Sequence, residues 1–221
     1  MTERLKRLFD ECGQSPWLDN LKRDLLLSGE LERLRDSGVR GLTSNPTIFQ
    51  KAIQGSDSYD SQFRELRRSG SSIEECYWQL VLTDILGALD VFEPVHTASD
   101  GLDGYVSVEV DPHLSGDAEA TLASARQIWN EVGRSNLMVK IPGTEASLPA
   151  VREAIARGIN VNVTLIFGLD RYRSVMEAYV AGLEDRQAKG ESITGIASVA
   201  SFFVSRVDTK IDARLAAIGS A

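Results

Sequence analysis

The stretch NVNVTLIF, residues 160–167, decides the fold because apolar and polar side chains alternate along it. Alternation with a period of two predicts a β-strand whose two faces meet different surroundings. The apolar face is expected to hold Val161, Val163 and Leu165, and the polar face Asn162 and Thr164. Buried parallel strands are usually apolar on both faces, so a polar second face indicates a sheet that packs on one side and carries chemistry on the other.

Short β-rich runs of this kind alternate with helical segments along the whole chain. The expected strands are Ser15–Asn20, Gly41–Ser44, Tyr105–Asp111, Asn136–Ile141, Asn160–Phe167 and Ile196–Val204. The expected helices between them are Glu30–Ser37, Ser72–Val91, Asp117–Val132, Glu145–Arg157 and Leu169–Lys189, and a further helix is expected after the sixth strand. Strand–helix alternation predicts an α/β fold with a parallel sheet.

Such a sheet either stays open and doubly wound or closes into a barrel. The open form usually has a Gly-rich phosphate loop after its first strand, and the sequence contains neither G-x-G-x-x-G nor a Walker A motif. Polar residues instead lie toward the C-terminal ends of the strands, as Glu109 does in YVSVEVD and Lys140 in NLMVKIPG. A TIM (β/α)₈ barrel has this arrangement, since its interior is packed below and its active site lies at the C-terminal face. We therefore predict a barrel of this type.

Bulk composition narrows the class of protein. The 221 residues are 43% hydrophobic and 25% charged, which is typical of a folded domain. A net charge of −8 argues against a nucleic-acid partner, and no apolar run is long enough for a membrane span. Cys12 and Cys76 lie far apart and histidines are few, so we expect reduced thiols, a cytoplasmic location and no metal site.

The expected chemistry depends on Lys140. Val139 and Ile141 flank it near the end of a buried strand, so the amine is expected to be partly desolvated, which disfavours its charged form. A neutral amine can attack a carbonyl carbon and form a Schiff base. For a lone lysine, a side chain that extends from the strand end into solvent is the alternative interpretation.

Two carboxylates are expected at the same end of the sheet. Glu109 ends the preceding strand, and neighbouring strands lie ~4.8 Å apart, so Glu109 and Lys140 are able to share a water or a proton. A buried ion pair without chemistry is the alternative. Asp19 ends the first strand and is a candidate base for carbon–carbon cleavage, with an N-cap of the following helix as its alternative.

Uncharged hydrogen-bonding side chains near the strand ends predict a polyhydroxylated substrate. They are Thr43, Asn45, Asn162, Thr164 and Ser201. Arg206 follows the sixth strand and provides a fork suited to a phosphate group. The alternatives are a turn-initiating role for Asn45, which precedes a proline, and a surface ion pair of Arg206 with Asp208 or Asp212.

Five stretches of the sequence resemble signature segments of transaldolases, in the bacterial branch related to the mycobacterial type. They are GLTSNPTIF (41–49), DGYVSVEVDP (103–112), NLMVKIPGT (136–144), GINVNVTLIF (158–167) and SVASFFVSRVD (198–208). The resemblance extends from about Ser15 to Asp212, which is most of the chain.

This resemblance implies roles for individual residues. Lys140 corresponds to the Schiff-base lysine, Glu109 and Thr164 to residues that hold a catalytic water, and Asp19 to the acid/base of carbon–carbon cleavage. The implied substrate-binding residues are Thr43, Asn45, Asn162, Ser201 and Arg206. The implied reaction moves a dihydroxyacetone unit from sedoheptulose 7-phosphate to glyceraldehyde 3-phosphate, in the non-oxidative pentose phosphate pathway, with sugar phosphates as partners and no cofactor.

Transaldolases continue through two more β/α units than the six expected here. We therefore expect residues 1–221 to form a single barrel domain that is incomplete at its C-terminus, and on its own to be poorly soluble and little active, because two strand edges would be exposed. Two other functions are open. One is a class I aldolase of the fructose 6-phosphate type, which uses the same lysine without transfer, and the other is an inactive barrel remnant that only binds.

Overall fold

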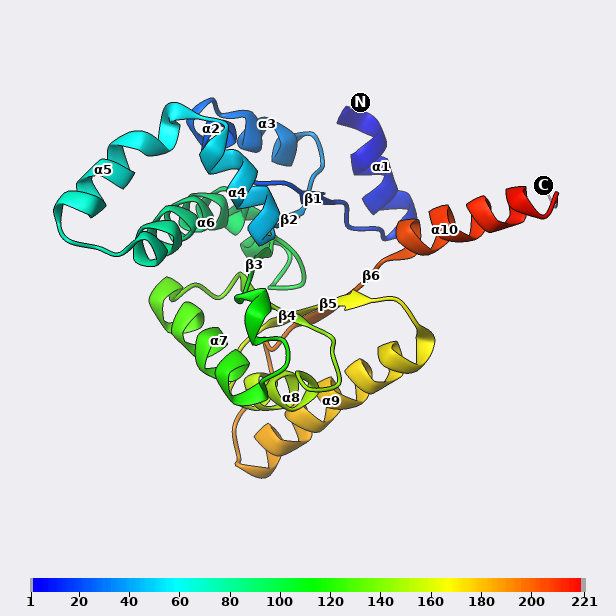
Figure 1. The fold of residues 1–221 in the computed structure, drawn as a ribbon. Helices are drawn as coiled ribbons and strands as arrows, with labels where there is room; N and C mark the ends of the chain where they lie inside the picture. The colour runs from blue at the N-terminus through cyan, green and yellow to red at the C-terminus, as the bar shows by residue number, and fades with distance from the viewer. Residues whose placement is uncertain (1, 220–221) are drawn as a thin grey trace. The chain divides into compact units, whose positions relative to one another are not determined.

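The computed structural model describes residues 2–219, which contain six β-strands separated by helices (Figure 1). The strands are β1 (Trp17–Asp19), β2 (Gly41–Thr43), β3 (Val106–Glu109), β4 (Leu137–Pro142), β5 (Val161–Ile166) and β6 (Ser198–Phe202). Their order in the sheet follows the chain, β1-β2-β3-β4-β5-β6. Parallel strands in chain order with helical connections confirm the predicted α/β fold of the (β/α)-barrel type, with six β/α units in this chain.

The chain divides into two compact units. The first comprises Met1–Glu109 with Ile128–Met138, and the second comprises Val110–Gln127 with Val139–Ala221. The helices of the first unit are α1 (Thr2–Cys12), α2 (Arg23–Leu27), α3 (Glu30–Asp36), α4 (Pro46–Gln54), the 3₁₀ turn η1 (Asp57–Tyr59), α5 (Asp60–Arg68) and α6 (Ile73–Ala98). The second unit holds the 3₁₀ turn η2 (Pro112–Leu114), α8 (Leu148–Ala156), α9 (Leu169–Ala188) and α10 (Val204–Ala217), while α7 (Ala118–Val132) is divided between the units.

In the first unit, a polar cluster ties together the segments that precede β1, β2 and β3. Ser15 Oγ donates to both Asp103 carboxylate oxygens at 2.8 Å, and Arg40 Nε donates to Asp103 Oδ2 at 2.5 Å. The amide of Gly104 also donates to Asp103, at 3.0 Å. Because Ser15, Arg40 and Asp103 each stand just before one of the three strands, their hydrogen bonds fix where the strands start relative to one another.

Gly41 permits the close pairing of β1 and β2. Trp17 and Gly41 are register partners, and a Cβ on Gly41 would lie 2.5 Å from Trp17 Cε2. The indole ring therefore occupies the space that a side chain at position 41 would need. A larger residue there would displace the ring and the start of β1.

In the second unit, the tightest helix packing joins α8 and α9. Gly182 of α9 lies against α8 so closely that a Cβ would come within 2.6 Å of the Arg152 carbonyl oxygen and 2.7 Å of Ile155 Cβ. Strand β5 pairs in parallel with both β4 and β6, so it is the central strand of this unit. Helix α10 buries none of its residues.

Most expected strands and helices are present, with shifted ends. Five observed strands lie within the expected runs, and β4 extends one residue further, to Pro142. Helix α6 continues past the expected end at Val91 to Ala98, and it begins with a capping box between Ser72 and Glu75. Helix α8 begins at Leu148 because the residues before it form a turn, in which the amide of Ser147 bonds to Thr144 Oγ1. Helices α1, α2, α4 and α5 were not among the expected elements.

The prediction that Leu165 shares the apolar face with Val161 and Val163 is wrong. Leu165 is 45% exposed and has a left-handed φ of 61°. Val163 pairs with Ala200, and Ile166 pairs with Phe202. Between these two pairs, β5 contains one residue more than β6. The extra residue is a β-bulge, and it brings Ile166 rather than Leu165 to the face of Val163.

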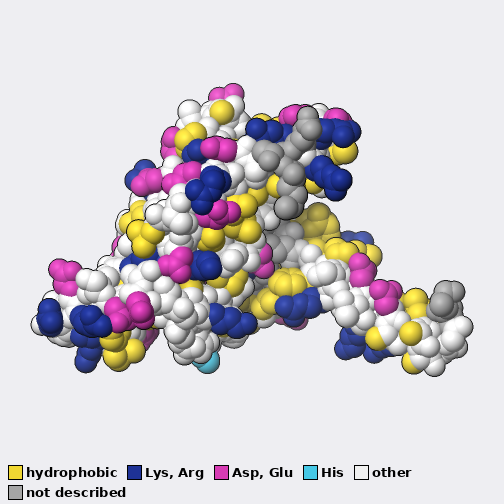
Figure 2. Space-filling view, turned by 90° about the horizontal axis from the view of Figure 1, so that it is seen from above, with side chains coloured by type: hydrophobic (Ala, Val, Ile, Leu, Met, Phe, Trp, Pro, Cys, Tyr) yellow, Lys and Arg dark blue, Asp and Glu magenta, His cyan; other side chains and the backbone are white. Residues whose placement is uncertain are grey.

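One face of the molecule carries side chains of mixed character. Figure 2 shows acidic and basic side chains interspersed with apolar ones on the visible face. Within residues 2–219, no helix combines the length and the apolar character that a membrane crossing requires.

Candidate active site

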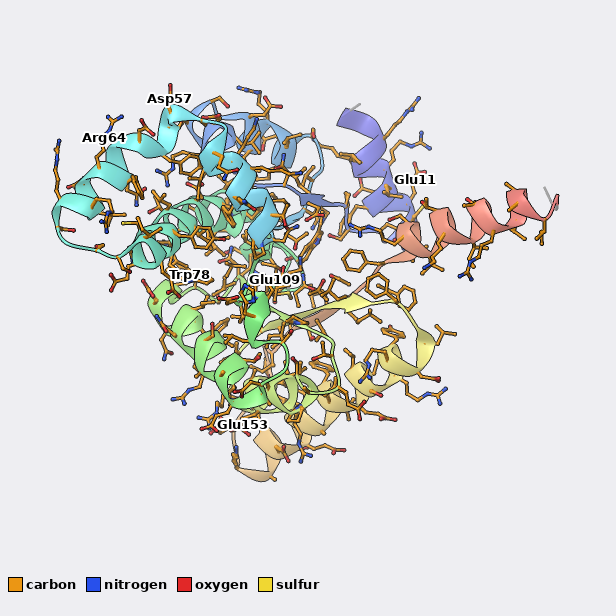
Figure 3. The ribbon with its side chains drawn as sticks, in the orientation of Figure 1. Glu11, Asp57, Arg64, Trp78, Glu109 and Glu153 are labelled. Atoms are coloured by element: carbon orange, nitrogen blue, oxygen red, sulfur yellow. The ribbon has the colours of Figure 1, made fainter. Side chains whose placement is uncertain are left out.

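In the first unit, the register of the strands places Asp19 beside Thr43 and Thr43 beside Ser107. Glu109 lies two residues beyond Ser107, so its side chain is on the same face of the sheet. Glu109 is 8% exposed and ends β3 (Figure 3), whereas Asp19 is exposed. Three of the predicted site residues, Asp19, Thr43 and Glu109, are therefore brought to one face at the C-terminal ends of parallel strands.

Thr43 has an unusual environment within this set. Its Oγ1 is buried and has no hydrogen-bond partner among the described protein atoms. Buried hydroxyl groups are nearly always paired, so an unpaired one on a face lined by carboxylates marks a place for a ligand or a water. Substrate binding by Thr43 remains a prediction that this geometry favours.

Two alternative roles considered from the sequence have different outcomes. Asn45 is the N-cap of α4, and its Oδ1 accepts a hydrogen bond from the Ile48 amide at 3.0 Å. The side-chain oxygen of Asn45 is thus used to cap α4. Its side-chain NH₂ group is the part left to bind a substrate. Asp19 does not cap the following helix, because the N-cap of α2 is Lys22, without a side-chain hydrogen bond.

In the second unit, Lys140 of β4 is the register partner of Asn162 of β5. Pro142 and Thr164 are partners two residues further along, so Asn162 and Thr164 lie on the same face as Lys140. Lys140 is 5% exposed, as its flanking apolar residues predict, and Asn162 and Thr164 are each 1% exposed. A lysine that extends into solvent is therefore excluded.

Ser201 fixes the orientation of Asn162. Ser201 Oγ of β6 donates a hydrogen bond to Asn162 Oδ1 at 2.8 Å. Because the serine occupies the carbonyl oxygen, the Asn162 amide group is held in one of its two orientations. The predicted site residues Lys140, Asn162 and Ser201 thus come from three adjacent strands of one unit.

Thr164 combines burial with an unpaired hydroxyl group. Its Oγ1 is buried without a hydrogen-bond partner among the described protein atoms, and its carbonyl oxygen accepts from the Gly143 amide at 2.7 Å. The next residue, Leu165, is the left-handed residue of the β5 bulge. β-Bulges are over-represented next to active sites, where they re-aim a side chain.

Arg206 lies in the first turn of α10 and is exposed. Its guanidinium carbon is 5.5 Å from the centroid of the Phe203 ring. No ion pair with Asp208 or Asp212 is formed within the part of the chain that the structure describes, so the surface ion pair is not observed. The exposed guanidinium is accessible to an anionic group.

Sequence reasoning missed a buried charged cluster in the first unit. Arg23 Nε donates to Asp84 Oδ1 at 2.7 Å, and Tyr59 Oη donates to Asp84 Oδ2 at 2.8 Å. Tyr59 Oη in turn accepts from the Arg23 amide at 2.9 Å, and the Arg23 guanidinium carbon lies 4.5 Å from the centroid of the Tyr59 ring. Burial raises the pKa of Asp84, although the hydrogen bonds that it accepts from Arg23 and Tyr59 oppose this shift, and burial also raises the pKa of Tyr59. The detectable signal was one aspartate within the apolar run LVLTDILGAL.

Comparison with known proteins adds an independent finding. The model of the family described as transaldolase/fructose-6-phosphate aldolase matches residues 16–220. A transaldolase of Thermobifida fusca is 52% identical over 221 residues, which is 100% of this chain and 60% of the relative. Transaldolase 2 of a Nostoc species is 50% identical over 93% of this chain and 54% of its own length. Transaldolase 1 of Streptomyces avermitilis is 51% identical over 99% of this chain and 58% of its own length.

The matches cover this chain almost completely but each relative only in part. The chain spans between about half and three-fifths of the length of the curated relatives named above. Each stretch that carries the predicted site residues, from Asp19 to Arg206, lies within the matched residues 16–220.

Proposed function

The chain belongs to the transaldolase/fructose-6-phosphate aldolase family, and from this premise we propose that it provides the Schiff-base chemistry of a transaldolase. The proposed reaction transfers a dihydroxyacetone unit from sedoheptulose 7-phosphate to glyceraldehyde 3-phosphate. The observation that carries the proposal is the buried amine of Lys140 beside Asn162, on a sheet face that also holds Thr164. An amine held on a buried, hydrogen-bonding face is placed to attack a carbonyl carbon and form a Schiff base.

The first half of the reaction forms the covalent intermediate. The Lys140 amine attacks the C2 carbonyl carbon of the ketose phosphate and gives a carbinolamine. Glu109, through a water held with Thr164, donates a proton to the departing hydroxyl group, which leaves as water, and an iminium ion (a protonated Schiff base) remains on Lys140.

The second half exchanges the aldehydes. The Asp19 carboxylate takes the proton of the C4 hydroxyl group, the C3–C4 bond breaks, and its electron pair moves into an enamine on Lys140 as the first aldehyde leaves. The enamine carbon then attacks the acceptor aldehyde, and Asp19 returns its proton to the new hydroxyl group. Water hydrolyses the iminium ion, which releases the ketose product and restores the amine, and the released proton returns to Glu109.

Substrate recognition in this proposal uses uncharged groups for the hydroxyls and a cation for the phosphate. The hydroxyl-binding residues are Thr43, Asn45, Asn162 and Ser201. Arg206 is proposed to bind the phosphate, supported by its exposed guanidinium group. A cytoplasmic location belongs to the same proposal and agrees with the free thiols of Cys12 and Cys76.

Reductive trapping tests the proposal directly. Residues 1–221 are mixed with fructose 6-phosphate and sodium borohydride, and the modified peptide is identified by mass spectrometry. We expect one ketose-derived secondary amine at Lys140, none in Lys140→Met, and an unchanged adduct in the control Lys189→Met, whose lysine is exposed after α9. A folded sample that forms no adduct would support the barrel remnant instead.

A second candidate function is cleavage without transfer. The matching family includes fructose-6-phosphate aldolase in its description, and that activity needs the same lysine. Products from fructose 6-phosphate are compared with and without erythrose 4-phosphate as the acceptor. A transaldolase gives sedoheptulose 7-phosphate only when the acceptor is present, whereas an aldolase releases free dihydroxyacetone in both reactions.

A further inference from the structure

The β-bulge of β5 holds Leu165 in an unfavourable backbone conformation, and the packing of the Leu165 side chain does not explain why. Thr164 and Leu165 together occupy the place opposite one residue of β6, and Leu165 adopts a φ of 61°. Left-handed backbone is unfavourable for residues other than glycine, asparagine and aspartate. The Leu165 side chain gains little in return, since it is 45% exposed.

The residue that follows the neighbouring strand β4 packs closely against this bulge. The Gly143 amide, just after β4, donates to the Thr164 carbonyl oxygen at 2.7 Å. A Cβ on Gly143 would lie 3.1 Å from that oxygen, and 3.3 and 3.4 Å from Cγ1 atoms of Val163 and Ile166. Gly143 thus contacts the strand on both sides of the bulge, three residues beyond Lys140.

The bulge also determines which side chain follows Thr164 on each face of the strand. Without the extra residue, the alternation of the strand would turn Ile166 to the polar face. With it, Val163 and Ile166 both lie on the same, fully buried side of the strand, and the polar face ends with Thr164. The Thr164 hydroxyl is buried there without a hydrogen-bond partner within residues 2–219. Backbone strain and an unmet hydrogen bond at the same place are typical of a functional site.

We propose that Leu165 is a positioning residue, whose left-handed conformation sets the Thr164 hydroxyl for its role beside Lys140. This inference rests on the proposed Schiff-base reaction and adds a backbone requirement at a residue outside the substrate-binding set. The chemical requirement is for the conformation, and the leucine side chain itself is dispensable.

Three substitutions at one position separate conformation from side chain. Leu165→Val keeps an apolar side chain but is β-branched, and such residues strongly resist positive φ. Leu165→Asn and Leu165→Gly remove the apolar side chain but accept the left-handed conformation. The measured quantity is the rate of formation of the borohydride-trapped adduct at Lys140, over a range of fructose 6-phosphate concentrations. Thermal unfolding of each variant is recorded alongside.

We expect Leu165→Val to lower the maximal rate about 10- to 100-fold, with little change in the half-saturating concentration, because a displaced catalytic group slows reaction more than binding. Leu165→Asn and Leu165→Gly are expected to stay within about threefold of the wild type. Because Leu165 acts through Thr164, adding Leu165→Val to Thr164→Val is expected to cause no further loss.

Each other outcome overturns the inference in a recognisable way. If Leu165→Asn lowers the maximal rate of adduct formation as much as Leu165→Val does, the leucine side chain is required and not the backbone conformation. If the losses of Leu165→Val and Thr164→Val multiply, Leu165 does not act through Thr164. If the wild type itself forms no adduct, the proposed function fails and this inference fails with it, whereas a wild-type adduct with no effect of Leu165→Val refutes this inference alone.

Discussion

The first unit buries Arg23, Asp84 and Tyr59 with their polar atoms hydrogen-bonded to one another, whereas the second unit buries Thr164 with its hydroxyl group unpaired. Both regions are shielded from solvent, with Asp84 and Thr164 at most 1% exposed. The cluster joins residues of α2, η1 and α6, and Thr164 lies in a strand that also carries a strained residue, Leu165.

The difference separates two roles of buried polar groups, one in stability and one in binding. A network in which each polar group has a partner holds elements together, since breaking it leaves uncompensated groups in the interior. An unpaired group lowers stability, so the fold retains it where another molecule completes the hydrogen bond. We therefore expect substitutions in the cluster to act on stability, and substitutions at Thr164 to act on the reaction.

The largest expected effect is that of Asp84→Ala. Removing one member of a buried ion pair leaves Arg23 charged and unpaired, which costs about 3–5 kcal/mol of unfolding free energy. Urea unfolding measures the loss. The matched control is Asp185→Ala, which breaks an Arg–Asp pair with Arg152 on the surface and is expected to change stability far less. Equal losses in the two variants would show that burial of the cluster does not matter.

Tyr59→Phe is expected to have the next largest effect. It removes a hydroxyl group that accepts from the Arg23 amide and donates to Asp84, while it leaves the ring in place. Two buried groups lose a partner, which costs about 1–3 kcal/mol. The same urea experiment tests this value, and a stability equal to the wild type would mean that water replaces the lost hydroxyl group.

Thr164→Val removes a buried hydroxyl of the opposite kind and sharpens the comparison. The substitution removes no hydrogen bond to the described part of the chain, so the free energy of unfolding is expected to fall by less than about 0.5 kcal/mol or to rise. The rate of adduct formation at Lys140 is expected to fall about 10²-fold, if Thr164 holds the water that carries the proton. A destabilisation as large as that of Tyr59→Phe would refute the distinction between the two regions.

How far the sequence predicts the structure differs between these regions. The alternation in residues 160–167 correctly gives a strand, and the apolar neighbours of Lys140 correctly give its burial. The same alternation fails at Leu165, because a period of two has no signal for an inserted residue. The bulge lies against Gly143, which follows the neighbouring strand β4, and local pattern does not reveal this contact.

The paired cluster was beyond sequence reasoning for a similar reason. Asp84 is conspicuous within an apolar run, but its partner Arg23 lies 61 residues away in a short helix that was not predicted. Partners so far apart are joined by tertiary packing alone. The family resemblance, in contrast, depended on local strings such as NLMVKIPGT, and the family match confirms it.

The smallest expected effects concern the pH dependence of stability. Two aspartates of the first unit are expected to respond to pH in opposite directions. Burial raises the pKa of Asp84, so the folded protein binds that proton more tightly than the unfolded chain does. The contribution of Asp84 to stability is then complete below the ordinary aspartate pKa of about 3.9 and is lost as the pH rises through the folded value. A hydrogen bond from Ser58 lowers the pKa of Asp24, so its contribution is present above the ordinary value and is lost as the pH falls.

Urea unfolding between about pH 3 and pH 7 checks both signs, when each asparagine variant is compared with the wild type. The stability advantage of the wild type over Asp84→Asn is expected to shrink as the pH rises, because only the wild type has a buried carboxylate to ionise. The advantage over Asp24→Asn is expected to grow over the same range. Slopes of the same sign would mean that Arg23 compensates the Asp84 charge fully, and the buried cluster would then resemble a surface ion pair in its response to protons.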